Sequence, residues 1–250
     1  MLTDAHVHIN EYGKKLPVAL EQIREHSIRT LAVSMDIPSF HETLRIAASE
    51  PLVIPSFGIH PWNAWRYAKR MEELTELLEI APAIGEIGLD HRFEKDPSRF
   101  PSQYPLFDFF LEAAERTGKL VNLHTSGAES QILNLLKLRK LPAIIVHWYS
   151  GPLHLVQDYL ELGAYFTIGA DIETSGKSRK LARDLPENQL LTETDNPGGW
   201  EWLYGDTGFP VLIDTVEAEL AQVRGVSQQE LSESVSKNFS NVLKAGGISI

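Results

Sequence analysis

The sequence predicts an α/β fold in which one (β/α)8 barrel, a closed parallel sheet of eight strands with outer helices, spans residues 1–250 as a single domain. Eight short apolar runs alternate with longer amphipathic segments along the 250 residues, a pattern typical of parallel βαβ units. The length also suits such a barrel. An open doubly wound sheet is the alternative, but the first strand-like run is not followed by a glycine-rich phosphate loop.

The elements follow one another in a regular order. The strand-like runs occupy residues 2–9, 28–35, 52–59, 83–90, 120–125, 143–149, 164–170 and 189–195. Helices are expected near residues 15–26, 39–49, 69–80, 102–117, 128–140, 152–162 and 177–184, and two more near 209–224 and 227–244 close the chain. The sequences SFHE at 39–42 and SQQE at 227–230 have the pattern of a helix N-terminal capping box. Gly118 is expected to end a helix in the left-handed conformation.

Composition narrows the classes of protein and partner. The chain has no cysteine, which excludes disulfides and thiolate metal sites and fits a reducing compartment. No long apolar run or secretory signal is visible, so we expect a cytoplasmic protein without a membrane partner. The formal net charge of −11 argues against tight, indiscriminate nucleic-acid binding. An anionic substrate, possibly DNA, would therefore need a local basic rim or a metal centre.

The stretch LTDAHVHIN places three polar side chains on one face of a strand. Asp4, His6 and His8 alternate with apolar residues, which is the two-residue period of a β-strand. Same-face neighbours lie about 7 Å apart, so two imidazoles can tilt toward one shared ion. A half-buried strand with a polar outer face would explain one histidine but rarely needs two. The motif therefore favours a metal or catalytic role.

Further ligand-type residues fall late in other strand-like runs. In a parallel barrel these positions meet at the C-terminal rim, where barrel active sites lie. Imidazole and carboxylate ligands suit a centre of two divalent ions, such as zinc, manganese or magnesium. Glu86 could bridge two ions, with three ligands completing one site and two the other. The candidate ligands are His6, His8, Glu86, His124, His147 and Asp195.

Other rim residues are candidates for contact with the substrate. His60 in GIHPW has two equally weighted interpretations, a turn histidine before Pro61 or a residue near the substrate. All five tryptophans lie just beyond strand-like runs, together with several basic side chains, and such groups can stack bases and hold phosphates. The candidates for substrate binding or for support of the ligands are Asp4, His60, Trp62, Arg92 and Trp148.

Six ordered motifs carry a family resemblance. DAHVH, GIHP, GEIGLD, NLHT, HWYSG and TETDNP resemble, in order and spacing, the signatures of the TatD family of metal-dependent hydrolases and deoxyribonucleases. The resemblance extends from residue 4 to about 197. It implies a TIM barrel of the amidohydrolase group whose metals are bound by the six candidate ligands. It also implies that Glu86 bridges the metals and that Asp195 is both a ligand and the proton acceptor from the attacking water.

The departures from the family pattern concern the substrate pocket. Ser126 occupies the position where the family often has arginine, Tyr149 replaces the usual phenylalanine, and the loop NPGGWEWLYGDTGFP is unusual. The leading hypothesis is a metal-dependent hydrolase that cleaves phosphodiester bonds, as a deoxyribonuclease does. A small-molecule amide, ester or phosphoester hydrolase is the alternative on the same centre. A non-catalytic metal-binding protein is the alternative from another class.

Overall fold

The computed structural model describes residues 1–249 and contains one parallel eight-stranded sheet, as predicted. Each strand pairs in parallel with the next one along the chain, in the order β1 to β8. The strands are β1 Thr3–Val7, β2 Arg29–Val33, β3 Val53–Phe57, β4 Ala83–Gly88, β5 Val121–His124, β6 Ile144–Val146, β7 Ala164–Ile168 and β8 Leu190–Thr192.

The seam between β1 and β8 almost closes the sheet into a barrel. The side chain of Thr192 donates to the carbonyl oxygen of Thr3 at 2.9 Å. Just beyond β8, the amide of Asp195 donates to the carbonyl of His6 at 2.9 Å, and the amide of His8 donates to the carbonyl of Asn196 at 2.9 Å. The C-terminal end of β1 is therefore held against the segment that follows β8.

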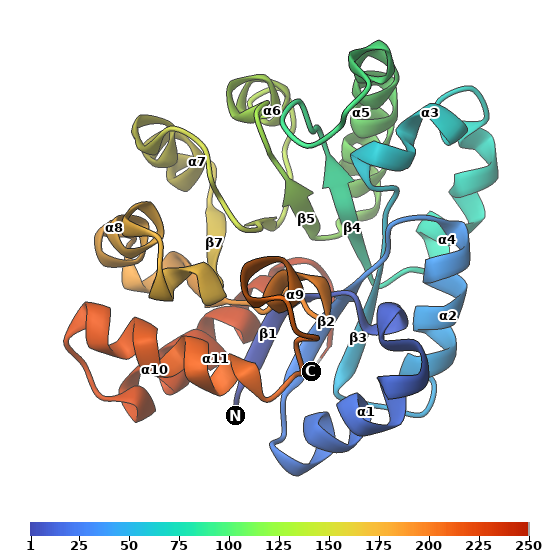
Figure 1. Ribbon diagram of the computed structural model, residues 1–250. Coiled ribbons are helices and arrows are strands. Elements are labelled where there is room, and N and C mark those ends of the chain that lie inside the picture. The colour runs from blue at the N-terminus through green and yellow to red at the C-terminus, as the bar shows by residue number, and fades with distance from the viewer. Residues whose placement is uncertain (250) are drawn as a thin grey trace.

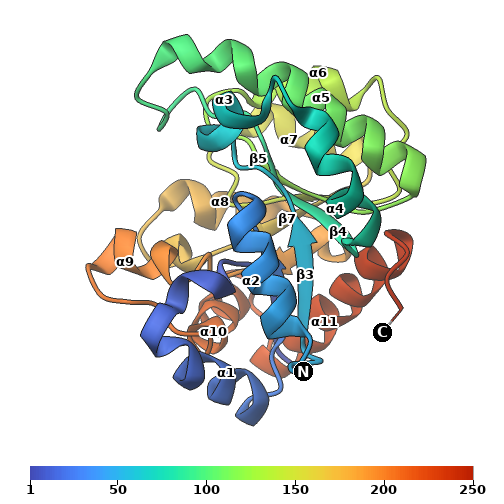
Figure 2. The same cartoon turned by 90° about the vertical axis from the view of Figure 1, so that its right-hand side faces the viewer.

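Most helices surround the barrel in chain order, whereas α9 lies across the middle of the view, in front of the strands (Figure 1). They are α1 Leu16–Glu25, α2 Ile37–Ala47, α3 Ala64–Tyr67, α4 Thr75–Ile80, α5 Phe100–Thr117, α6 Glu129–Leu136, α7 Val156–Glu161, α8 Gly176–Asp184, α9 Gly198–Tyr204, α10 Leu212–Arg224 and α11 Gln228–Ala245. Figure 2 shows α2 beside β3, against which it packs. No helix within residues 1–249 combines the length and hydropathy needed to cross a bilayer.

The helix ends confirm two local predictions and correct a third. Gly118 ends α5 with a φ of 67°, in the left-handed region. Ser227 and Glu230 form a capping box at the start of α11. The capping box predicted at residues 39–42 is wrong, because Asp36 caps α2 and Ser39 completes that box. Pro38 fits this earlier start, since the first helical turn tolerates a residue without an amide hydrogen.

Close packing of β4 against β5 depends on a glycine. A Cβ atom on Gly88, whose φ is 149°, would lie 1.9 Å from the carbonyl oxygen of His124. That separation is impossible, so a side chain here would push the strands apart. The glycine of the GEIGLD motif thus lets the end of β5, and with it His124, lie directly against β4.

Candidate metal centre

The six predicted ligands converge at the C-terminal ends of the strands. Glu86 lies within β4, His6 lies within β1 with His8 just beyond it, and His124 is the last residue of β5. The remaining two lie past their strands rather than in them, because β6 ends at Val146 and β8 at Thr192. His147 follows β6 directly. Asp195 follows a short extension of β8 and has a φ of 53°, which turns the chain sharply at the rim.

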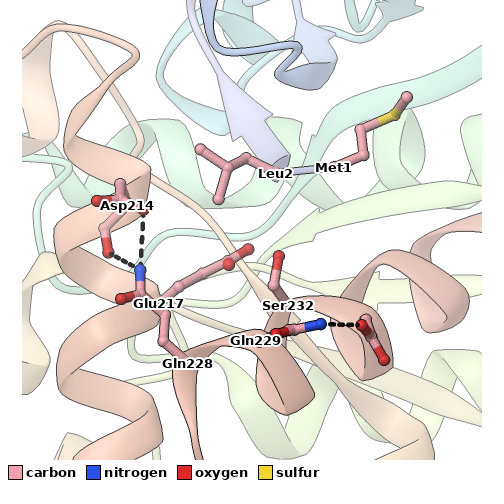
Figure 3. A pocket seen from close by; sticks show the side chains of 8 residues that line it. Met1, Leu2, Asp214, Glu217, Gln228, Gln229 and Ser232 are labelled. Carbon is pink, nitrogen blue, oxygen red and sulfur yellow. Dashed lines mark hydrogen bonds between the residues drawn. The ribbon is translucent and has the colours of Figure 1, made fainter.

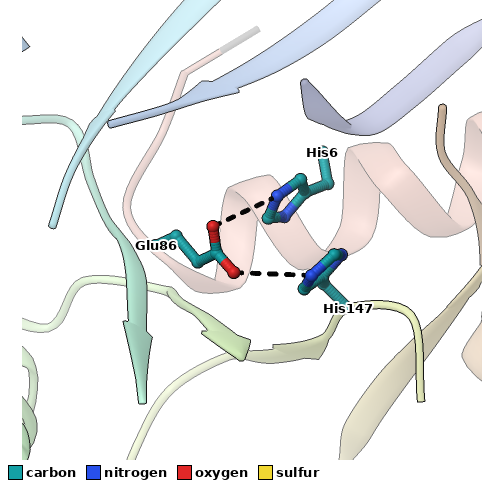
Figure 4. A group of neighbouring side chains, drawn as sticks. All are labelled: His6, Glu86 and His147. Carbon is teal, nitrogen blue, oxygen red and sulfur yellow. Dashed lines mark ion pairs between the residues drawn. The ribbon is translucent and has the colours of Figure 1, made fainter. Parts of the chain in front are cut away.

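Glu86 lies at the centre of this cluster, and both of its oxygens face imidazole nitrogens. Oε2 lies 3.6 Å from Nε2 of His6 and 3.4 Å from Nε2 of His8. Oε1 lies 3.4 Å from Nε2 of His147 and 2.8 Å from Nδ1 of His124. Figure 4 shows His6 and His147 side by side, each directed at a different oxygen of the carboxylate.

Asp195 completes the cluster on the side of β1. Its Oδ1 atom lies 3.4 Å from Nε2 of His6 and 3.3 Å from Nε2 of His8. The Glu86 side chain is 2% exposed, whereas that of Asp195 is 21% exposed. The cluster is therefore buried around Glu86 and reaches solvent beside Asp195.

The spacing of the donor atoms fits bound cations better than direct hydrogen bonds. Five imidazole–carboxylate distances around Glu86 and Asp195 lie between 3.3 and 3.6 Å, whereas N–H···O bonds usually lie below about 3.2 Å. Two atoms that each lie about 2.1 Å from one tetrahedral cation are about 3.4 Å apart. The residues present thus fit the divalent ions that the sequence predicts.

One ring nitrogen of His6 has a lone pair that could bind a cation. Its Nδ1 lies 2.8 Å from Oδ1 of Asn122, whose amide nitrogen donates to the carbonyl of Ala5 at 2.9 Å. Since Oδ1 accepts, Nδ1 of His6 donates, and in the neutral ring Nε2 keeps its lone pair. Within residues 1–249 this buried Nε2 has no hydrogen-bond partner. A cation between His6 and the carboxylates would satisfy it.

The carboxylates of Asp90 and Glu193 orient His124 and His147, and the sequence patterns predicted neither carboxylate. Asp90 Oδ2 lies 3.0 Å from Nε2 of His124, and Glu193 Oε2 lies 3.2 Å from Nδ1 of His147. Each pairs with the ring nitrogen that faces away from Glu86, the arrangement that fixes the tautomer of a metal-binding histidine. Strand periodicity could have found Glu193, because residues two apart share a face with the predicted ligand Asp195.

The carboxylates and imidazoles of the cluster stabilise each other's charged forms. Burial opposes ionisation of His8, but the carboxylates of Asp195 and Glu86 outweigh it and raise the pKa of His8 to about 10. Burial also acts against charge on Glu86, yet the surrounding imidazoles hold the pKa of this carboxyl well below its usual range. The ionised carboxylates thus draw protons onto the imidazoles. Cations would compete for the same lone pairs, so their binding should release protons.

His60 joins the cluster more closely than a turn histidine would. Its Nε2 lies 3.5 Å from Oε1 of Glu86, and its Nδ1 accepts a hydrogen bond from the amide of Trp62 at 3.2 Å. Burial lowers the pKa of His60 to about 3, with help from the neighbouring imidazoles of His124 and His8. A neutral His60 whose Nδ1 accepts carries its proton on Nε2, directed at the cluster.

The other candidate substrate residues occupy different places. Trp62 is 41% exposed at the rim and donates through its indole to Oδ2 of Asp90 at 2.8 Å. Trp148, which is partly exposed, follows His147, and Arg92 lies on the loop after β4. Asp4 is fully buried in the β1–β8 seam, where it accepts hydrogen bonds from His6 and Thr194. Its geometry suits a role in holding the seam rather than contact with substrate.

Comparison with known proteins identifies the family. The family model described as "TatD related DNase" matches residues 3–244. The chain belongs to this family. The human protein named deoxyribonuclease TATDN3 is 26% identical over 95% of this chain and 92% of its own length. The Escherichia coli K12 protein YjjV, named as a metal-dependent hydrolase, is 27% identical over 94% of this chain and 95% of its own length.

Solved structures of this family share the fold. The crystal structure of E. coli YjjV superposes with a TM-score of 0.88 at 25% identity, covering 96% of this chain and 97% of that one. A TatD family hydrolase from Entamoeba histolytica gives a TM-score of 0.81 at 16% identity, covering 96% and 97% of the two chains, a likeness of fold alone. The TIM barrel predicted from the strand pattern is thereby confirmed.

Proposed function

We propose that this TatD family protein is a metal-dependent hydrolase that cleaves phosphodiester bonds in DNA at a centre of two divalent ions. The observation that carries the proposal is the position of Glu86 between two groups of imidazoles. One oxygen faces His6 and His8, which also share Asp195, and the other faces His147 and His124. The names of the relatives, deoxyribonuclease and metal-dependent hydrolase, support the same chemistry.

Each side chain has a role that follows from its position. Two divalent ions at such a centre would supply Lewis-acid activation of a water molecule and of the scissile bond. His6, His8 and Asp195 would hold one ion, His124 and His147 the other, and Glu86 would bridge them. Zinc, manganese or magnesium suits these nitrogen and oxygen ligands.

Asp195 is the best placed proton acceptor. Burial opposes its ionisation, but the neighbouring imidazoles of His6 and His8 hold the pKa of Asp195 well below its usual range. The group is therefore ionised at neutral pH. Its Oδ1 faces the two histidines, and its partial exposure lets the carboxylate meet a water from the solvent side. His60, with its proton on Nε2, can donate a hydrogen bond to a substrate oxygen or to Glu86.

The exposed aromatic side chains around the centre favour a nucleic acid over a small amide or ester. Trp62 is 41% and Trp202 is 69% exposed, and large apolar side chains in such numbers at a metal rim suit stacking with bases. A net charge of −11 would repel a polyanion at long range. We therefore infer that the divalent ions and the basic side chains near the centre attract DNA.

Turnover measurements can separate the candidate functions. The protein is stripped with a chelator and reloaded with zinc, manganese or magnesium, and it is then assayed on single- and double-stranded DNA, bis(p-nitrophenyl) phosphate, and amide and ester substrates. We expect metal-dependent cleavage of the phosphodiesters, and its loss in Glu86→Gln. Turnover confined to amides or carboxylic esters would favour the small-molecule hydrolase. Tight metal binding without turnover of any substrate would favour the non-catalytic alternative.

A further inference from the structure

The turn after β5, which includes Ser126, packs against the loop after β4. The amide of His91 donates to the carbonyl oxygen of Ser126 at 2.8 Å. A Cβ atom on Gly127 would lie 3.1 Å from the amide nitrogen of Arg92 and 3.2 Å from its Cβ. The backbone of Arg92 therefore rests on the turn after β5, where the family often has an arginine and this chain has Ser126.

Arg92 extends from there across to the loop after β6. Its Nη1 donates to Oγ of Ser150 at 2.6 Å, and its Nη2 lies 3.6 Å from Oε1 of Glu129. Lys177, at the start of α8, donates to the carbonyl oxygen of the same Ser150. The two cations therefore meet at Ser150, one at its hydroxyl and the other at its carbonyl oxygen.

Arg92 and Lys177 leave part of their positive charge open to a ligand. Glu129 is the carboxylate in ion-pair contact with Arg92, and its Oε1 also accepts from the amide of Gly127 at 3.1 Å. Arg92 and Lys177 thus bring two positive charges to Ser150, in a protein whose net charge is −11. The Arg92 side chain remains 42% exposed, so its unused N–H groups are open to an anion. Planar guanidinium groups bind phosphate in two-point contacts.

The basic pair is connected to the metal centre through short contacts. Asp90 accepts from the amide of Arg92 at 2.8 Å through Oδ1, while its Oδ2 lies 3.0 Å from Nε2 of His124. One carboxylate thus orients a predicted ligand and the loop that carries Arg92. On the other side, the Trp148 ring lies 6.4 Å from that of His147 and 5.8 Å from that of Trp202.

Exposed aromatic rings lie beside the basic pair. Phe93, next to Arg92, is 38% exposed, and its ring centroid lies 6.4 Å from that of Trp202. Trp202 belongs to α9, in the segment where the sequence departs from its family. The loop of Arg92 thus carries an exposed aromatic ring beside an exposed cation. That combination suits a nucleotide better than a simple sugar phosphate.

We propose that Arg92 and Lys177, joined through Ser150, form a subsite for a second phosphate of the substrate, next to the phosphate at the metal centre. The proposal rests on the proposed function, since it assumes that a phosphate occupies the centre. It makes Arg92 a specificity-determining residue: substrates with two or more phosphates bind well, and single phosphodiesters bind poorly. The cations thereby supply, in an acidic protein, the local attraction that a nucleic acid needs.

Equilibrium binding of small nucleotides tests the subsite without requiring turnover. Calorimetry on the manganese-loaded protein compares thymidine 3′,5′-bisphosphate with its two monophosphates, none of which contains the phosphodiester bond that the proposed reaction would cleave. We expect the additional phosphate to lower Kd about tenfold or more, because each charge-assisted hydrogen bond to phosphate contributes appreciably even at a partly exposed site. The gain should shrink in 1 M salt, which screens exposed charges.

Matched variants assign the gain to the two residues. Arg92→Ala combined with Lys177→Ala should reduce the ratio of Kd values to within about twofold of one, a loss of the charge-assisted contacts. Arg92→Lys should retain part of it, since it keeps the charge and loses the planar fork. Arg45→Ala combined with Lys137→Ala, which removes the same two positive charges from ion pairs on the surface, should leave the ratio unchanged. Each ratio is taken within one variant, so a change in folded fraction cancels.

The outcomes distinguish this proposal from the proposed function. Equal Kd values for nucleotides with and without the extra phosphate would overturn the subsite, as would a gain that persists in the double variant. Absence of phosphodiester turnover, with the Arg92-dependent gain intact, would instead overturn the proposed function and leave a two-phosphate binding site.

Discussion

Glu217 offers a test of the energetics of this fold far from the metal centre. It lies on α10, is fully buried, and borders a pocket of about 490 Å³ between the start of the chain, α10 and α11 (Figure 3). Met1 and Leu2 precede β1, so the pocket lies at the N-terminal ends of the strands. Within residues 1–249 neither carboxylate oxygen of Glu217 has a hydrogen-bond partner. Burial raises the pKa of Glu217 to about 7.

The direction of the pH effect follows from that raised pKa. An unfolded chain would give Glu217 its ordinary pKa of 4.5, so between about 4.5 and 7 the folded state holds the proton more tightly. The free energy of unfolding therefore falls as pH rises through this window and stays low above it. At about 1.4 kcal/mol for each pKa unit, the loss from pH 4.5 to pH 8 is about 3 kcal/mol at most.

Replacement of Glu217 by Gln should remove this loss. The amide has nearly the same shape and stays neutral, so Glu217→Gln should match the parent near pH 4.5 and exceed it by up to about 3 kcal/mol at pH 8. At about 2–4 °C for each kcal/mol in a chain of this size, the gain is easily resolved. Urea or thermal unfolding of the metal-free proteins at both pH values measures it, and titration of the histidine cluster cancels between parent and variant.

A second variant at the same pocket controls for the removal of charge. Glu233 also borders the pocket, but it is exposed on α11. Glu233→Gln should change stability by less than about 0.5 kcal/mol, as is usual at the surface. If Glu217→Gln shifted stability equally at both pH values, or if Glu233→Gln matched its pH dependence, the assignment of a buried neutral acid would be refuted.

Three further variants test the centre. Glu86→Gln keeps the size of the side chain and removes its charge, so metal-dependent turnover should fall at least about a hundredfold; normal turnover with normal metal content would contradict this. Asp195→Asn should lower turnover by about 10² to 10⁴ while at least one metal stays bound; retention of a third of parental activity with full metal would make Asp195 a purely structural carboxylate. Glu193→Gln should weaken metal affinity about 10- to 100-fold through His147, and a titration showing unchanged affinity would exclude this orienting role.

The convergence of the candidate ligands could be predicted from sequence because two periodicities act together. Alternation within residues 2–9 places His6 and His8 on one face, and parallel strands bring the ends of distant runs to one rim. These rules also place Glu86 and His124 without tertiary information. They misplaced the strand ends near His147 and Asp195, because β6 and β8 stop earlier than their apolar runs. Side chains at the rim can reach the centre from a turn as well as from a strand.

The supporting residues could not be predicted in the same way. Asp90 is in the motif GEIGLD, but nothing in that pattern shows that its carboxylate meets both His124 and the indole of Trp62. Those contacts join three separate loops, and loop conformation depends on packing rather than on periodicity. The short helix α9 likewise lies in a segment for which the sequence predicts a loop, since GGWEWLY begins with two glycines, which weaken helices.

The seam of the barrel and one half of the metal centre are the same piece of structure. The hydrogen bond from the amide of Asp195 to the carbonyl of His6 fixes the distance between β1 and the segment after β8. The same two residues, together with His8, face one another across a gap of 3.3 to 3.4 Å that a cation would fill. Asp4 binds both sides of this seam, through the amides of His6 and Thr194. A cation held here would thus link the first strand to the last, so metal binding should stabilise the barrel at the point where its sheet must close.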